Sequence, residues 1–328
     1  MTIASIRRAR PGSTTAMTGR ILLLMAMLLV VVTGFAIVNP AFIQLSSFAT
    51  VLQFSVMLAL VALGQAFVVM SGGGGIDLSV GGIVSVSSVF TALAMNAGIV
   101  PWWLVPAVPV VIGAALGFGN AVMINRLKIL PLIATLGTYF LFSGLAMAVT
   151  KGATVMTSAD WITAFGRGTV FGIPLMFLVL VVPAYMIGAG VLTHTSWGRW
   201  IYATGRNERA ARLTGIPVDR LRITVYTLSG MLAGLAAFVS IAWFGAGRPN
   251  MGQNLEMESL TCALLGGVAI AGGAGGVVSV LIAVMVITTL KTGLQFNNIS
   301  TVWQIGIVGA LLLAVLLLER FKPVRKHS

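Results

Sequence analysis

Runs of about 20 apolar residues recur along the chain, and this feature restricts the fold more than any other. A helix needs roughly 20 such residues to cross the hydrocarbon core of a bilayer, which is about 30 Å thick. Hydrophobic residues make up 58% of the 328 positions and charged residues only 8%, with a mean hydropathy of +1.03. Soluble domains do not have this composition. The sequence therefore predicts an all-α, polytopic integral membrane protein.

Ten segments have the apolar character expected of membrane-crossing helices. They cover residues 21–38, 50–70, 83–97, 104–124, 129–149, 170–192, 223–244, 260–270, 277–296 and 302–318. The first follows several arginines, as in a signal peptide, but it is long for one and no A-x-A cleavage site follows. We interpret it as the first transmembrane helix. The predicted organisation is a tail (1–20), a transmembrane domain (21–319) that includes a long loop (193–222), and a basic tail (320–328).

Basic residues are distributed unevenly between the two sides that ten crossings create. The two tails, the loop with Arg126 and Lys128, and the loop 193–222 fall on one side and hold all but four of the 20 basic residues. Lysine and arginine concentrate in cytoplasmic loops, so both termini are predicted to be cytoplasmic. All seven tryptophans lie at or beyond predicted span ends, as expected of a membrane-interface residue.

Several function classes are disfavoured by what the sequence lacks. The net charge of +13 is divided among short loops and tails, with no basic, aromatic-rich face for nucleic acid. The sequence has one cysteine, Cys262, and no H-E-x-x-H, G-x-S-x-G or G-x-x-x-x-G-K-[ST] motif. We therefore expect no catalytic site, no metal site and no cofactor in this chain, and no P-loop through which it could bind ATP.

Glycines recur within the predicted spans, for example in GAALGFGN (113–120) and SGMLAGLAA (229–237). Small residues let helices approach closely in lipid, where hydrophobicity does not drive association. This pattern predicts a compact bundle.

The loop 193–222 contains the signals for a short helix outside the membrane. Asn207 is a good N-cap, Glu208 favours the positive end of a helix, and Gly215 can form a left-handed C-cap. Pro217 prevents continuation. A helix of about eight residues is marginal in water unless it packs against something. Two interpretations remain: a charged connector that only enforces topology, or a helix that docks on a cytoplasmic partner.

Five segments in this order resemble ribose-type (monosaccharide, carbohydrate-uptake class 2) bacterial ABC transporter permease subunits. They are GGIDLSVGG (74–82), IATLGT (133–138), YATGRNERAARLTGIPVDRLRI (202–223), LEMESLTCALLGGVAIAGGAGG (255–276) and VWQIGIVGALLLAVLLLER (302–320). The resemblance covers nearly the whole chain.

The resemblance implies a subunit of the bacterial inner membrane that pairs with a second permease copy, identical or related. A periplasmic solute-binding protein would deliver a monosaccharide or similar small polar solute, and a separate cytoplasmic ABC ATPase would bind ATP and Mg. The residues expected to couple to this ATPase are Gly205, Asn207, Glu208, Ala210, Ala211, Arg212, Leu213, Gly215 and Ile216. Arg209 stands where many relatives have alanine. The alternative is an ion-coupled secondary transporter, for which an ionisable residue beside a broken helix is typical; such a carrier does not need a docking helix.

Asp77, within SGGGGIDLSVGG (71–82), suits either of two roles. It could cap the helix that begins near Val80, or the glycine-rich segment could line a translocation path whose cavity satisfies its backbone polar groups. Other polar side chains that would suit a neutral sugar on this path are Ser79, Ser85, Asn120 and Thr138.

Overall fold

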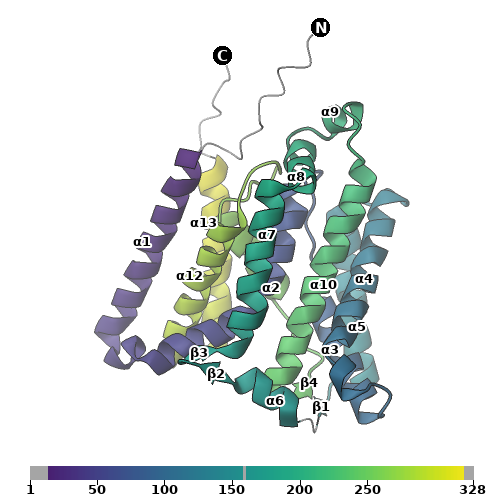
Figure 1. Ribbon diagram of the computed structural model, residues 1–328. Coiled ribbons are helices and arrows are strands. Elements are labelled where there is room, and N and C mark those ends of the chain that lie inside the picture. Colours follow the sequence, from purple (N-terminus) through teal and green to yellow (C-terminus); the bar gives the residue numbers. More distant parts are fainter. Residues whose placement is uncertain (1–13, 158–159, 321–328) are drawn as a thin grey trace.

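The computed structural model describes residues 14–157 and 160–320 as an all-helical bundle with two short strand pairs (Figure 1). Its longer helices are α1 (Thr14–Val38), α2 (Leu45–Met70), α3 (Val80–Asn96), α4 (Ala107–Asn125), α5 (Pro131–Thr150), α7 (Val182–His194), α10 (Val218–Phe244), α11 (Leu255–Leu265), α12 (Val277–Phe296) and α13 (Thr301–Arg320). Shorter helical elements are η1 (Pro40–Ile43), η2 (Trp102–Leu104), α6 (Asp160–Arg167), η3 (Phe177–Val181), α8 (Ser196–Arg206) and α9 (Glu208–Leu213).

The strand pairs are both antiparallel. Strand β1 (Val155–Met156) pairs with β4 (Ala246–Gly247), and β2 (Thr169–Val170) pairs with β3 (Ile173–Pro174). Both lie with α6 at the end of the bundle opposite α8 and α9, whereas α1 begins and α13 ends at the same end as α8 and α9 (Figure 1). The two ends of the bundle are therefore structurally distinct.

Among the described residues, seven segments are long and apolar enough to cross a bilayer, and two apolar helices are shorter. The seven are Thr18–Val38, Leu45–Met70, Ala107–Asn125, Pro131–Thr150, Phe177–His194, Val218–Phe244 and Val277–Phe296, and the two are Val80–Asn96 and Thr301–Leu311. These helices confirm a polytopic, all-helical membrane protein. They overlap nine of the ten predicted spans.

The predicted span 260–270 is wrong. Helix α11 begins earlier, at Leu255, and ends at Leu265. Because an α-helix rises about 1.5 Å per residue, its 11 residues are long enough for only roughly half of the bilayer core. The glycine-rich chain that follows turns instead of continuing the helix, with positive φ angles at Gly267, Gly272 and Gly273.

Two other predicted boundaries also shift. The predicted span 170–192 starts as the β2–β3 pair, and its helix begins only at Phe177. Helix α1 already begins at Thr14, inside the predicted tail 1–20. Residues 1–13 of that tail, and residues 321–328 of the predicted C-terminal tail, lie outside the described residues.

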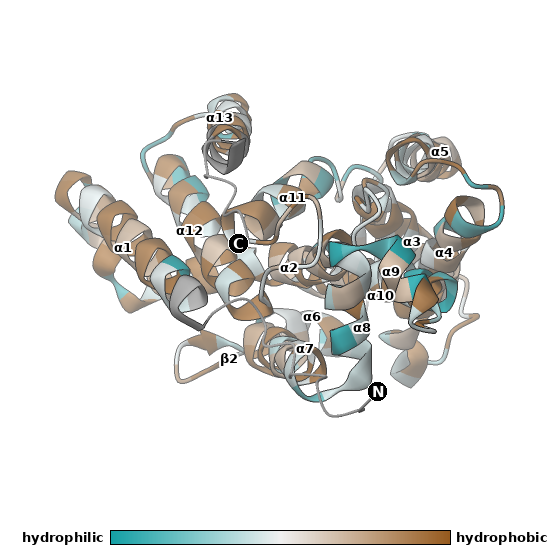
Figure 2. Cartoon of the chain, turned by 90° about the horizontal axis from the view of Figure 1, so that it is seen from above, coloured by the Kyte–Doolittle hydropathy of each residue, from teal (hydrophilic) through white to brown (hydrophobic). Residues whose placement is uncertain are grey.

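Helices α2 and α10 form the centre of the bundle, and α1 lies at its edge (Figure 2). The most apolar windows of α2 and α10 are 89% and 78% buried, against 6% for α1. Apolar side chains exposed on the outer helices, such as Val30 and Phe140, suit contact with lipid.

Glycines join α4 to α10, as the glycine pattern predicts. Gly113 and Gly117 on α4 lie against the backbone of Gly230 and Tyr226 on α10, and Gly234 lies against Pro109. A methyl group on any of these glycines would collide with a backbone oxygen of the facing helix. Close helix approach through small residues therefore compacts this part of the bundle.

Candidate functional site

Two short helices, α8 and α9, form the connection between α7 and α10. Thr195 caps α8, since its Oγ1 accepts a hydrogen bond from the Gly198 backbone N at 3.2 Å. Asn207 interrupts the helix and caps α9, with Oδ1 accepting from the Ala210 N at 3.0 Å. Gly215 follows with φ +82°. The predicted caps at Asn207 and Gly215 are confirmed.

Helix α8 was not anticipated from the sequence. The signal available was Thr195 as an N-cap, followed by apolar residues at helical spacing: Trp197 packs on Phe67 of α2, with ring centroids 5.6 Å apart, and Ile201 is fully buried. Thus α8 rests on the bundle, while α9 projects beyond it (Figure 1).

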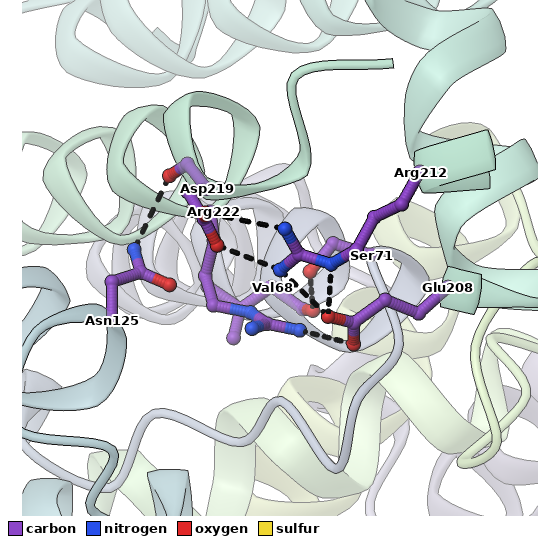
Figure 3. Close-up of polar contacts among 7 residues, drawn as sticks. All are labelled: Val68, Ser71, Asn125, Glu208, Arg212, Asp219 and Arg222. Atoms are coloured by element: carbon purple, nitrogen blue, oxygen red, sulfur yellow. Dashed lines mark hydrogen bonds and ion pairs between the residues drawn. The ribbon is translucent and has the colours of Figure 1, made fainter. Parts of the chain in front are cut away.

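Charged side chains hold α9 to the start of α10 (Figure 3). Arg212 binds Glu208 Oε1 at 2.9 Å and Asp219 Oδ1 at 2.7 Å, and Arg222 binds Glu208 Oε2 at 2.8 Å. Asn125 at the end of α4 donates to the Asp219 backbone O at 3.2 Å. Single exposed ion pairs contribute little, but a connected set fixes geometry. This network connects α9 to the start of α10 and, through Asp219, to the end of α4.

The same contacts shift the pKa of Glu208. Burial alone would raise this pKa, but hydrogen bonds and charge from Arg222 and Arg212 outweigh burial and lower it. The Glu208 carboxylate is therefore charged at neutral pH.

The predicted coupling residues differ in exposure. Ala211 is buried, and Gly205, Glu208 and Ile216 are partly buried, whereas Asn207, Ala210, Arg212, Leu213 and Gly215 are exposed. Leu213, the last residue of α9, is 84% exposed. The outer face of α9 thus presents an apolar side chain on a helix held by ion pairs.

Gly205, near the end of α8, joins α9 to two glycine-rich segments of the bundle. A Cβ on Gly72, in the segment after α2, would lie 2.6 Å from the Gly205 Cα. The Gly273 N, in the segment after α11, donates to the Met70 O at 2.9 Å, and Arg206 Nε donates to the Gly273 O at 3.3 Å. Any movement of α8 must therefore move or separate these segments.

Asp77 lies in a closed polar cluster inside the bundle and is fully buried. Its Oδ1 accepts hydrogen bonds from the Ser79 N at 3.0 Å and the Ser79 Oγ at 2.6 Å, and its Oδ2 accepts from Ser229 Oγ of α10 at 2.8 Å. Asn120 Nδ2 of α4 donates to Ser79 Oγ at 2.7 Å. The cluster links the start of α3 to α4 and α10.

Of the other predicted path residues, Ser85 and Thr138 are not part of this cluster. Ser85 Oγ accepts from the Gly252 N at 3.0 Å, and Thr138 Oγ1 donates to the Ala134 O of its own helix at 3.1 Å. The sequence prediction also missed Ser229, although it lies in one of the glycine-containing stretches noted above.

A partly buried charge pair lies toward the opposite end of the bundle. Lys291 Nζ on α12 donates to both carboxylate oxygens of Glu258 on α11, at 2.7 and 2.8 Å. Lys291 is one of the four basic residues that fall outside the basic side of the predicted topology, and it is paired within the bundle. The spacing of the two residues carries no local motif that would reveal the pair.

The chain is similar to known permease proteins over most of its length. Residues 47–316 match the family described as "Branched-chain amino acid transport system / permease component". The chain is 35% identical to the ribose import permease protein RbsC of Bacillus subtilis (strain 168), over 90% of this chain and 91% of that protein. It is 32% identical to the D-allose transport system permease protein AlsC of Escherichia coli (strain K12), over 89% of each. It is 31% identical to the autoinducer 2 import system permease protein LsrD of Enterobacter sp. (strain 638), over 90% of each. No solved structure matches the chain.

Proposed function

The chain belongs to the family of branched-chain amino acid transport system permease components, and we propose that it forms the membrane pathway of a bacterial ABC importer for a monosaccharide or related small polar solute. It is a multi-pass subunit of the bacterial inner membrane and a transport component, not an enzyme. The similar proteins named above import ribose, D-allose and autoinducer 2, which are small polar solutes.

The main observation behind the proposal is the way in which α9 is capped and held to α10. It is capped by Asn207, held to α10 through Arg212 and Arg222, and presents Leu213 on its outer face. Such a helix can transmit a push from a partner, whereas a connector that only enforces topology needs none of these contacts. This favours an ATP-driven importer over an ion-coupled carrier. In the proposal ATP and Mg bind to a separate cytoplasmic ATPase.

The orientation we propose places α8 and α9, the start of α1 and the end of α13 in the cytoplasm. Support comes from the charge distribution, because the side that includes the loop 193–222 holds most of the basic residues. A periplasmic solute-binding protein then docks at the end with α6 and the strand pairs. Thiol labelling checks the orientation: Ser300→Cys should react in intact cells, and Arg209→Cys only after permeabilisation.

A second permease subunit, either another copy or a related chain, completes the pathway in this proposal. The test is uptake of D-ribose and D-allose by proteoliposomes containing this chain with the ATPase and binding protein encoded beside it. Uptake should require ATP and both partners. Uptake that continues without ATP and follows an imposed proton or sodium gradient would show that the chain is an ion-coupled carrier.

A further inference from the structure

A cavity of about 320 Å³, lined by both polar and apolar side chains, lies between α2, α10, α11, α12 and α13, away from the Asp77 cluster. It is found where α10 and α12 end and α13 begins, which is the end of the bundle opposite α9 (Figure 1). Two of its lining residues, Gln253 and Gln295, are exposed, so the cavity communicates with the outside at this end. Its volume is at the lower limit for pockets that hold small organic molecules.

The cavity lining suits a neutral, polyhydroxylated solute. The Glu258–Lys291 pair supplies acceptor and donor groups whose charges cancel, so the cavity does not favour a net charge. Gln253 and Gln295 add amide groups that both donate and accept. Trp243 contributes an aromatic surface that can pack on the C–H face of a sugar ring.

One buried hydroxyl in the lining also lacks a partner. Thr288 is 4% exposed, lines the cavity, and its Oγ1 has no hydrogen-bond partner in the described structure. Buried polar atoms without partners are rare, because leaving one unpaired costs free energy. In the Asp77 cluster the carboxylate already accepts three hydrogen bonds, and the described atom that lacks a partner there is Asn120 Oδ1.

We propose that this cavity is an entrance chamber that receives the neutral sugar or polyol from the binding protein before the solute enters the pathway that the second permease subunit completes. The proposal rests on the proposed import function and assigns the solute contact to the Glu258–Lys291 cavity instead of the Asp77 cluster. Passage through the chamber is then required for uptake, whereas docking of the binding protein is a separate event on the surrounding surface.

The test blocks the chamber after the complex has assembled, so that folding is not affected. Gln295→Cys and Gln253→Cys place thiols in the cavity from two different segments, and Ser300→Cys places one at the same end outside the lining. The native Cys262 is fully buried and should not compete. Each reconstituted variant is treated with a small methylthiolating reagent or a bulky maleimide, and D-ribose uptake and binding-protein-stimulated ATP hydrolysis are measured.

The bulky reagent should lower uptake at least roughly tenfold in both cavity variants, because it fills a pocket of small-molecule size. The small reagent should leave most uptake, and stimulated ATP hydrolysis should persist in every case. Three results would each overturn the chamber. They are equal inhibition of uptake by labelled Ser300→Cys, loss of stimulated ATP hydrolysis together with uptake, and normal uptake after bulky labelling of the cavity. Uptake by the unlabelled complex that requires neither ATP nor the binding protein would instead contradict the proposed function.

Discussion

Replacing Gly72 by alanine tests the contact through which α8 reaches the interior of the bundle. Gly72 has φ +75°, a conformation that costs an L-residue about 1–2 kcal/mol. The new methyl group would also lie 2.6 Å from the Gly205 Cα and 3.0 Å from the Gly205 O. Carbon atoms normally approach to about 3.5–4.0 Å, so one of the two backbones must move by about 1 Å. Overpacking of this kind typically adds about 1–3 kcal/mol, which gives a total of about 2–5 kcal/mol.

Gly74 is a matched control two residues away. Its φ is also positive, but a methyl group there would have no atom of the described residues within 4 Å. Gly74→Ala therefore incurs only the backbone cost and no overpacking. We expect Gly74→Ala to retain stimulation of ATP hydrolysis by the loaded binding protein and Gly72→Ala to lose most of it. Thermal unfolding of the purified proteins should rank them in the same order. Equal stability and equal stimulation in the two variants would refute the idea that the Gly72–Gly205 contact transmits coupling.

Three further predictions concern the buried cluster and α9. Asp77→Asn keeps an accepting oxygen and should reach normal membrane abundance on immunoblots. Asp77→Leu leaves Ser229 without its partner, so this variant should be depleted. Normal abundance of both variants together with lost uptake would assign Asp77 to the solute path. Gly215→Val should keep normal membrane abundance but weaken retention of the ATPase in co-purification. The surrounding space is open, but the left-handed backbone conformation of Gly215 is unfavourable for valine. Unchanged ATPase retention and unchanged stimulation of ATP hydrolysis would make the loop a topological anchor only. The pKa of Glu208 lies below its usual 4.5, so the stabilisation from its ion pairs is present at higher pH and is lost as the pH falls through the lowered pKa. The protection of the α9 amides, measured as their exchange rate relative to the intrinsic rate at the same pH, should therefore decrease only in acid, and a loss of protection between pH 8 and 6 would contradict the network.

The local signals in the sequence predicted α9 well because its ends depend on neighbouring residues. Asn207 caps through an atom three residues away, and Gly215 adopts a backbone conformation that few other residues accept. The glycine pattern likewise predicted close helix packing, because glycines such as Gly113 and Gly230 within apolar helices allow two helix backbones to approach closely.

Contacts between distant segments could not be predicted in this way. Ser229 is 152 residues from Asp77, and Lys291 is 33 residues from Glu258, so no local spacing indicates either pair. The length of α11 was also missed, because hydropathy continues past Leu265 while the glycines that follow end the helix.

The central claim is that α9 docks on the ATPase, and a cross-link from its exposed apolar residue tests this most directly. Leu213→Cys should form an adduct with the ATPase in the assembled complex when treated with a short thiol-to-amine cross-linker, whereas Ser300→Cys at the other end should not. Mass spectrometry identifies the joined peptides. An ATPase that co-purifies without any Leu213→Cys adduct, or an adduct formed with the binding protein instead, would contradict the account.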